Sequence, residues 1–151
     1  MTKSFNFPLQ KVLDVRTMVE DAKAIELQKA QAEIEREKQH LARIQSEKDA
    51  LIGEASVAGE KGEISLQSLN NRREYVEQLS TQIEEQGETV AKSQEAAEEQ
   101  RLAFVQASKE KMVIEKLKEH HKDAFRKKMN QDQVKNESEV ASRISQNEGR
   151  L

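Results

Sequence analysis

The chain has 151 residues, of which 35% are hydrophobic, 35% are charged and only 3% are aromatic. It carries too little apolar surface for a compact core, yet its apolar residues recur too regularly for disorder. The net charge of −3 disfavours general nucleic-acid binding, and the absence of cysteine excludes disulfides and thiol chemistry. These properties predict an all-α protein: a long two-helix antiparallel coiled-coil hairpin, with a C-terminal overhang of helix 2, in a single domain spanning residues 1–151.

The first predicted helix covers about residues 8–52. Pro8 suits its first turn, where the N–H that proline lacks would have no helical partner. A seam with alternating steps of three and four residues then indicates a coiled coil. Its members are Leu27, Ala30, Ile34, Glu37, Leu41, Ile44, Lys48 and Leu51.

Glycines interrupt this seam and predict a turn over residues 53–63. Ser65 is the predicted N-cap of the second helix, and Ile64 and Leu69 would form a hydrophobic staple around it. The second helix is predicted over about residues 65–130 or longer, with a frayed tail to 151. Its seam comprises Leu69, Val76, Leu79, Ile83, Val90, Ala97, Phe104, Ala107, Ile114 and Phe125. Polar residues interrupt it at Arg72, Gln86, Ser93, Gln100, Lys111 and Lys118.

Facing residues of an antiparallel hairpin have a constant sum of residue numbers. A sum near 117 aligns the two seams, for example Leu41 with Val76 and Ile34 with Ile83. The same register places Phe5 near Met112. Helix 2 should therefore extend alone beyond about residue 112.

The overhang predicted in this way is mostly basic. Residues 109–128 contain eight lysines and arginines and four acids, whereas residues 84–99 contain six glutamates and one lysine. A basic helix of this kind serves a protein contact, an anionic lipid or a nucleic acid, or is simply a solvated face. The scarcity of aromatic residues favours the protein contact among the functional alternatives.

No residue pattern indicates catalysis. The adjacent His120 and His121 point about 100° apart on a helix and do not converge on one metal. The sequence has no glycine-rich phosphate loop and no nucleophile beside a base. We therefore predict no enzyme activity, no cofactor and no metal site. No apolar run reaches the ~20 residues that span a bilayer, so direct membrane insertion is not expected.

One stripe on the second helix is a candidate binding face. Tyr75, Leu79, Gln82 and Gln86 follow one another at steps of four, three and four residues. Tyr75, the single tyrosine, either packs partly against helix 1 or is an exposed anchor for a partner.

Three segments resemble the FliJ family of the flagellar type III export apparatus. They are FNFPLQKVLDVR at residues 5–16, YVEQL at residues 75–79 with Ile83 and Gln86 after it, and KEKMVIEKLK at residues 109–118. The resemblance implies a non-enzymatic coiled-coil stalk with three kinds of partner. These are the hexameric export ATPase FliI, the cytoplasmic domain of the export-gate protein FlhA, and the export chaperones.

By position, the resemblance assigns the stripe of Tyr75, Leu79, Gln82 and Gln86 to the export gate. The basic residues expected to face the ATPase ring are Lys109, Lys111, Lys116, Lys118, Lys122 and Arg126. The expected location is cytoplasmic, at the inner face of the cell membrane through the apparatus, and the free chain is expected to be a monomer. The alternatives are the equivalent stalk of a virulence-type injectisome and a dimeric coiled-coil scaffold.

Overall fold

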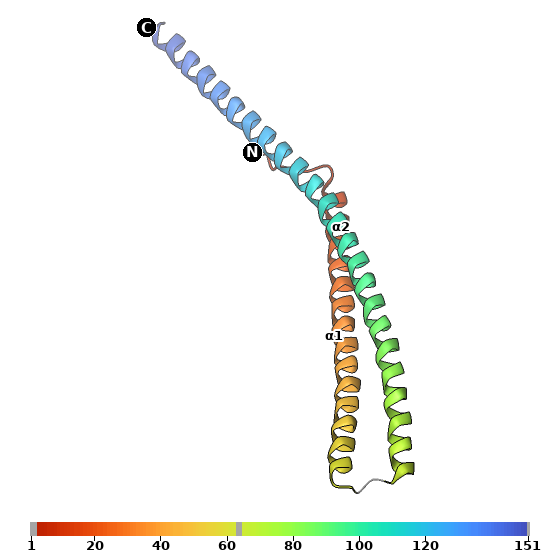
Figure 1. Cartoon of the computed structure of the whole chain (residues 1–151). Helices are drawn as coiled ribbons and strands as arrows, with labels where there is room; N and C mark the ends of the chain where they lie inside the picture. The colour runs from red at the N-terminus through yellow and green to blue at the C-terminus, as the bar shows by residue number, and fades with distance from the viewer. Residues whose placement is uncertain (1–2, 63–64, 151) are drawn as a thin grey trace. The chain divides into compact units, whose positions relative to one another are not determined.

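The computed structural model describes residues 3–62 and 65–150, and in them it contains two long helices and no strand (Figure 1). Helix α1 comprises Gln10–Glu60, with 51 residues, and helix α2 comprises Leu66–Glu148, with 83 residues. Both segments are rich in Ala, Glu, Lys, Gln and Leu, which have high helix propensity. The predicted all-α, two-helix hairpin is confirmed.

The chain divides into two compact units. The hairpin unit comprises Asp21–Val105, and the terminal unit comprises Met1–Glu20 together with Gln106–Leu151. Each unit contains a stretch of α1 and a stretch of α2.

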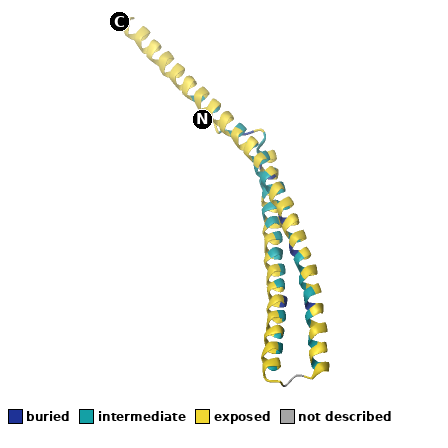
Figure 2. Cartoon of the chain, viewed as in Figure 1, coloured by how far each residue is buried: buried dark blue, intermediate teal, exposed yellow. Residues whose placement is uncertain are grey.

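In the hairpin unit the two helices lie side by side and antiparallel, and the residues between them form a narrow covered strip (Figures 1 and 2). All eight predicted seam residues of α1 are buried or half-buried. On α2 the most buried side chain is Leu79, which is 2% exposed, and Val90 and Ala97 are also buried. Both predicted seams are thus the contacting faces, although Leu69, the first member on α2, is exposed.

The register of the hairpin unit differs from the predicted one. Tyr75 donates a hydrogen bond to Glu47, and Gln86 donates to Glu37. The residue numbers of these facing pairs add to 122 and 123, whereas the predicted sum was near 117. The predicted pairing was wrong because it assumed that α1 ends near residue 52.

Helix α1 continues through the first predicted turn residues and ends at Glu60. A glycine in a helix costs only about 1 kcal/mol, so Gly53 and Gly59 weaken the helix without ending it. The chain reverses after Gly62, whose φ of 69° lies in the left-handed region. On the far side, the hydroxyl of Ser65 accepts a hydrogen bond from the N–H of Ser68 at 3.2 Å, which confirms the N-cap. Ile64, the predicted staple residue, lies outside the described residues.

In the terminal unit, residues 3–9 form a leader that precedes α1 and packs on α2. The ring of Phe5 lies 5.7 Å from that of Phe125, and the ring of Phe7 lies 5.5 Å from that of His121. Phe5 therefore does not lie near Met112. The prediction that α2 extends uncovered from about residue 112 is wrong, because the leader and the start of α1 cover α2 beyond that residue.

Beyond Met129, every described residue of α2 is exposed (Figure 2). The overhang therefore exists, but it begins later than predicted. It is helical to Glu148 rather than frayed. Residues 131–148 contain no Gly or Pro, and the helix ends where Gly149 donates its N–H to the carbonyl of Ser145 at 3.1 Å.

Candidate partner-binding surfaces

The stripe predicted for the export gate is not one continuous exposed face in the hairpin unit. Tyr75 is 41% exposed and Gln82 is exposed, but Leu79 is buried between the helices and Gln86 is half-buried. The phenol O–H of Tyr75 donates to the Glu47 carboxylate at 2.5 Å, and this bond to a negative group raises the pKa of Tyr75. An approaching partner therefore meets Tyr75 and Gln82, whereas Leu79 holds the two helices together.

Gln86 contributes to the pairing of the helices. Its Nε2 donates to the main-chain carbonyl of Glu37 at 3.0 Å and also to the Glu37 carboxylate. The bond from Gln86, followed by one involving Glu33, lowers the pKa of Glu37. Glu37 is one polar interruption of the first seam and Gln86 is one of the second, and the structure brings them together. A polar pair in an apolar seam favours one register over its neighbours.

The six basic residues predicted to face the ATPase fall into two groups in the terminal unit. Lys109, Lys116, Lys122 and Arg126 are exposed and available to a partner. Lys111 and Lys118 are half-buried: the ammonium of Lys118 donates to the side-chain oxygen of Gln10 at 2.8 Å, and that of Lys111 donates to Glu20 at 3.1 Å. These two lysines join α2 to the start of α1.

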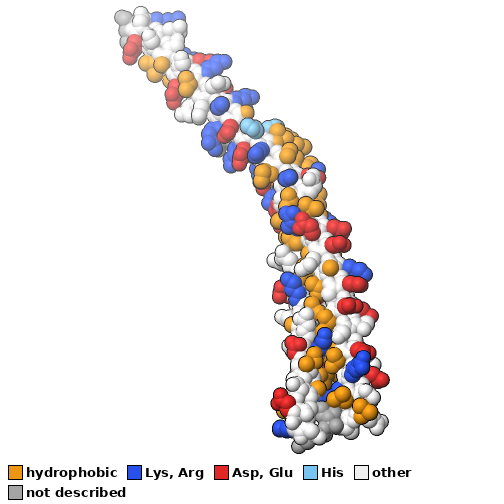
Figure 3. Space-filling view, viewed as in Figure 1, with side chains coloured by type: hydrophobic (Ala, Val, Ile, Leu, Met, Phe, Trp, Pro, Cys, Tyr) orange, Lys and Arg blue, Asp and Glu red, His pale blue; other side chains and the backbone are white. Residues whose placement is uncertain are grey.

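Charge pairing also occurs on the same unit between Arg16 and Glu110. On the face that Figure 3 shows, acidic and basic side chains are interspersed along the helices, and apolar side chains gather where the helices of the hairpin unit meet. The exposed cations are therefore spaced along a helix surface rather than clustered in one pocket. Such an arrangement suits contact with an extended acidic surface.

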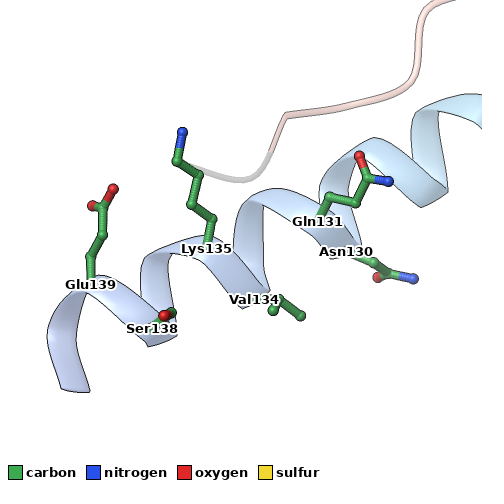
Figure 4. A pocket seen from close by; sticks show the side chains of 6 residues that line it. All are labelled: Asn130, Gln131, Val134, Lys135, Ser138 and Glu139. Carbon is green, nitrogen blue, oxygen red and sulfur yellow. The ribbon is translucent and has the colours of Figure 1, made fainter. Parts of the chain in front are cut away.

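The hollows on the described surface do not form an enclosed site. The one drawn in Figure 4 has a volume of about 590 Å³ and is open to solvent. Two rows of side chains on α2 line it: Asn130, Val134 and Ser138 in one, and Gln131, Lys135 and Glu139 in the other. A hollow made by one helix surface does not exclude water from a reacting group.

The described residues include neither a metal-binding cluster nor a membrane-spanning stretch. In that part of the chain, no group of three or more His, Cys, Asp or Glu side chains could hold a metal ion. Neither α1 nor α2 has a stretch apolar enough to cross a bilayer.

Three contacts that join distant parts of the chain were not predicted from the sequence: Phe7 with His121, Glu20 with Lys111, and Glu37 with Gln86. A signal for the last pair exists in the sequence. Each predicted seam has polar interruptions, and a register that matches polar with polar places Glu37 against Gln86. Matching only apolar positions discards this information, because Leu, Ile and Val fit one another in several registers.

The chain matches a known protein family. The family described as "Flagellar FliJ protein" matches residues 5–150, almost the whole chain. No curated protein and no solved structure matches the chain. The match spans the leader, both helices and the overhang, so the family assignment does not depend on the FNFP and EKLK motifs alone. The chain belongs to the FliJ family and is a component of the flagellar export apparatus.

Proposed function

We propose that the chain is the central stalk and adaptor of the flagellar export apparatus. Its terminal unit enters the ring of the hexameric export ATPase FliI and promotes ring assembly and ATP turnover. The chain also links the ring to the cytoplasmic domain of the gate protein FlhA and to export chaperones. Family membership supports the assignment to the apparatus, and the two long helices support the role of a stalk.

The observation that carries this proposal is the set of exposed cations on α2 of the terminal unit. Lys109, Lys116, Lys122 and Arg126 project from a body only one or two helices thick. A body without six-fold symmetry contacts each subunit of a six-membered ring differently. It can therefore favour different conformations in different subunits through differential binding.

The test is charge reversal of the exposed cations alone. Lys109→Glu, Lys116→Glu and Lys122→Glu are combined, leaving Lys111 and Lys118 to hold α1. The expected result is a loss of most of the stimulation of FliI ATP turnover, with helicity unchanged by circular dichroism. Lys29→Glu, Lys38→Glu and Lys92→Glu make the same charge change on exposed residues of the hairpin unit and serve as the control. Equal stimulation of ATP turnover by the two triple variants would contradict the assignment of these cations to the contact with FliI.

The gate contact is proposed for Tyr75 and Gln82, the exposed members of the predicted stripe. Tyr75→Ala with Gln82→Ala should weaken capture of the FlhA cytoplasmic domain. Leu79 is not a suitable test of this contact, because its truncation would damage the hairpin itself. Tyr75→Phe retains the ring and serves as the matched control. Undiminished capture by the double alanine variant would exclude this face.

The same proposal covers the state and location of the chain. It acts without catalysing a reaction itself, is a monomer outside the complex, and is held at the inner face of the cell membrane through the apparatus. Sedimentation velocity tests directly whether the free chain is a monomer. A concentration-dependent dimer would favour the coiled-coil scaffold instead.

A further inference from the structure

The leader, residues 3–9, is held on α2 by aromatic side chains. Phe7 is 4% exposed although it lies outside any helix, and its ring meets the His121 ring edge-on. Phe5 lies one turn further along α2, tilted against Phe125. The carbonyl of Phe7 accepts the N–H of Gln10 at 3.1 Å, which connects the leader to the first turn of α1.

This packing decides where the covered part of α2 ends. Leu117, Phe125 and Met129 are half-buried, and every described residue beyond Met129 is exposed. Lys3 lines the same open hollow as Met129, so the leader reaches that far along α2. The leader therefore covers the part of α2 around His121 and Phe125, which would otherwise continue the exposed overhang.

The attachment is of a kind that opens readily. A short segment outside regular structure has few backbone hydrogen bonds to break, and such segments open at a small fraction of the global unfolding free energy. Once the leader is released, the rings of His121 and Phe125 lose their cover on the α2 face that also carries Leu117. The strip from Leu117 to Phe125 itself carries Lys118 and Lys122 against Glu119 and Asp123, and residues 126–128, within one helical turn of it, add three basic side chains.

We propose that the α2 strip Leu117–Phe125 is a docking surface that the chain's own leader occupies in the free protein. Its partner is a segment with apolar or aromatic side chains flanked by acidic ones. The leader shows that two aromatic rings fit the strip, and the excess of basic residues over residues 109–128 selects acidic flanks. This inference rests on the proposed function, because it assigns the segment to the export ATPase and makes the leader its competitor.

The first experiment tests the leader without any partner. In the full-length chain, Phe5→Ala is combined with Phe7→Ala, and a fluorescent peptide of residues 3–10, KSFNFPLQ, is added. If the leader closes the site about nine-tenths of the time, the peptide should bind the variant about tenfold more tightly than the wild type. A peptide of the same composition in scrambled order is the control. Equal binding to wild type and variant would overturn the competition by the leader.

Hydrogen exchange gives a second readout on the same proteins. Amides of residues 117–129 should exchange about tenfold faster in the double variant, whereas those of residues 84–99 should keep their rates. Val12→Ala with Val15→Ala removes two exposed apolar side chains from α1 and serves as the control. It should leave the exchange rates of both groups of amides unchanged. If Phe5→Ala/Phe7→Ala loses helicity, Phe5→Leu/Phe7→Leu keeps apolar bulk while removing the ring contacts and takes its place. Unchanged exchange at residues 117–129 would exclude the leader as a cover.

The third measurement separates the docking surface from the proposed function. The affinity of the export ATPase for the double variant should exceed that for the wild type by several-fold, since the competitor is gone. If the peptide and exchange results hold but the two affinities are equal, the ATPase does not use this strip. If the ATPase binds neither protein, the stalk function fails and the partner assignment fails with it, while the leader's occupation of α2 stands on the first two results.

Discussion

The ammonium of Lys111 lies 3.1 Å from the carboxylate of Glu20, and the two side chains are only 23% and 19% exposed. Glu20 belongs to α1 and Lys111 to α2, so this ion pair crosses between the helices of the terminal unit. Other ion pairs, such as Lys23–Glu26 and Arg101–Glu98, join neighbours on one helix and are more exposed. Surface pairs of that kind contribute little to stability. The Glu20–Lys111 pair is the better candidate for a measurable contribution to the stability of the fold.

Acid should weaken this link. A hydrogen bond from Ser108 and then one from Lys111 lower the pKa of Glu20. Because the folded pKa lies below the unfolded one, the stabilisation is present above the unfolded pKa and is lost as the pH falls through the folded value. In Glu20→Gln, the melting temperature should fall less between about pH 5 and pH 3 than in the wild type. Melting curves by circular dichroism across that range provide the measurement. Glu54→Gln, an exposed site in the hairpin unit, is the control, and identical pH profiles for all three proteins would contradict the prediction.

The single tyrosine allows a direct titration. The hydrogen bond to Glu47 and the charge of its carboxylate raise the pKa of Tyr75 above the ordinary tyrosine value of 10.0. Absorbance of the phenolate should therefore show a midpoint above 10.0, and Glu47→Gln should lower it. For a raised pKa, the stabilisation is present below the unfolded pKa and disappears as the pH rises through the folded one. A midpoint that Glu47→Gln leaves unchanged would mean that the hydrogen bond does not persist in solution.

Truncation of Leu79 tests the seam of the hairpin unit. Leu79 is 2% exposed, so Leu79→Ala should lower the free energy of unfolding by roughly 2–4 kcal/mol. Leu102 is 55% exposed on the same helix, and Leu102→Ala should cost less than about 0.5 kcal/mol. Urea denaturation followed by circular dichroism measures both. Similar losses for the two variants would show that Leu79 is not the more important contact.

Alanine should have opposite effects at two glycines. Gly62 has a φ of 69°, which an alanine adopts at a cost, so Gly62→Ala should destabilise by about 1 kcal/mol. Gly87 lies within α2 and a Cβ there would meet nothing within 4 Å, so Gly87→Ala should stabilise by about 0.5–1 kcal/mol. The same denaturation assay compares both variants with the wild type. A shift of both variants in one direction would contradict the assignment of Gly62 to a left-handed turn.

The contacting faces of the helices could be read from the sequence residue by residue. The seam from Leu27 to Leu51 is covered in the structure along its whole length, and so are the predicted polar interruptions, from Arg72 to Lys118. The reason is local: a helix repeats its orientation every three to four residues, so apolar spacing alone identifies the face that meets a partner.

The candidate binding faces could be predicted only in part. The spacing of Tyr75, Leu79, Gln82 and Gln86 predicts that they follow one side of α2. However, Tyr75 and Gln82 are exposed whereas Leu79 is buried and Gln86 is half-buried, and spacing alone does not show which members remain exposed. Exposure depends on where α1 lies, and the same applies to Lys111 and Lys118, whose partners Glu20 and Gln10 are on the other helix.

By itself, the sequence determined the helical class, the two seams and the family motifs, because each depends on residues close together along the chain. Only the tertiary structure decided the register, the end of α1 at Glu60 and the cover that Phe5 and Phe7 provide over α2. Alternative registers of two apolar seams differ little in buried area, so polar pairs such as Glu37 and Gln86 select among them. Those pairs, like the leader on α2, join residues far apart in sequence, and neither composition nor periodicity contains that distance information.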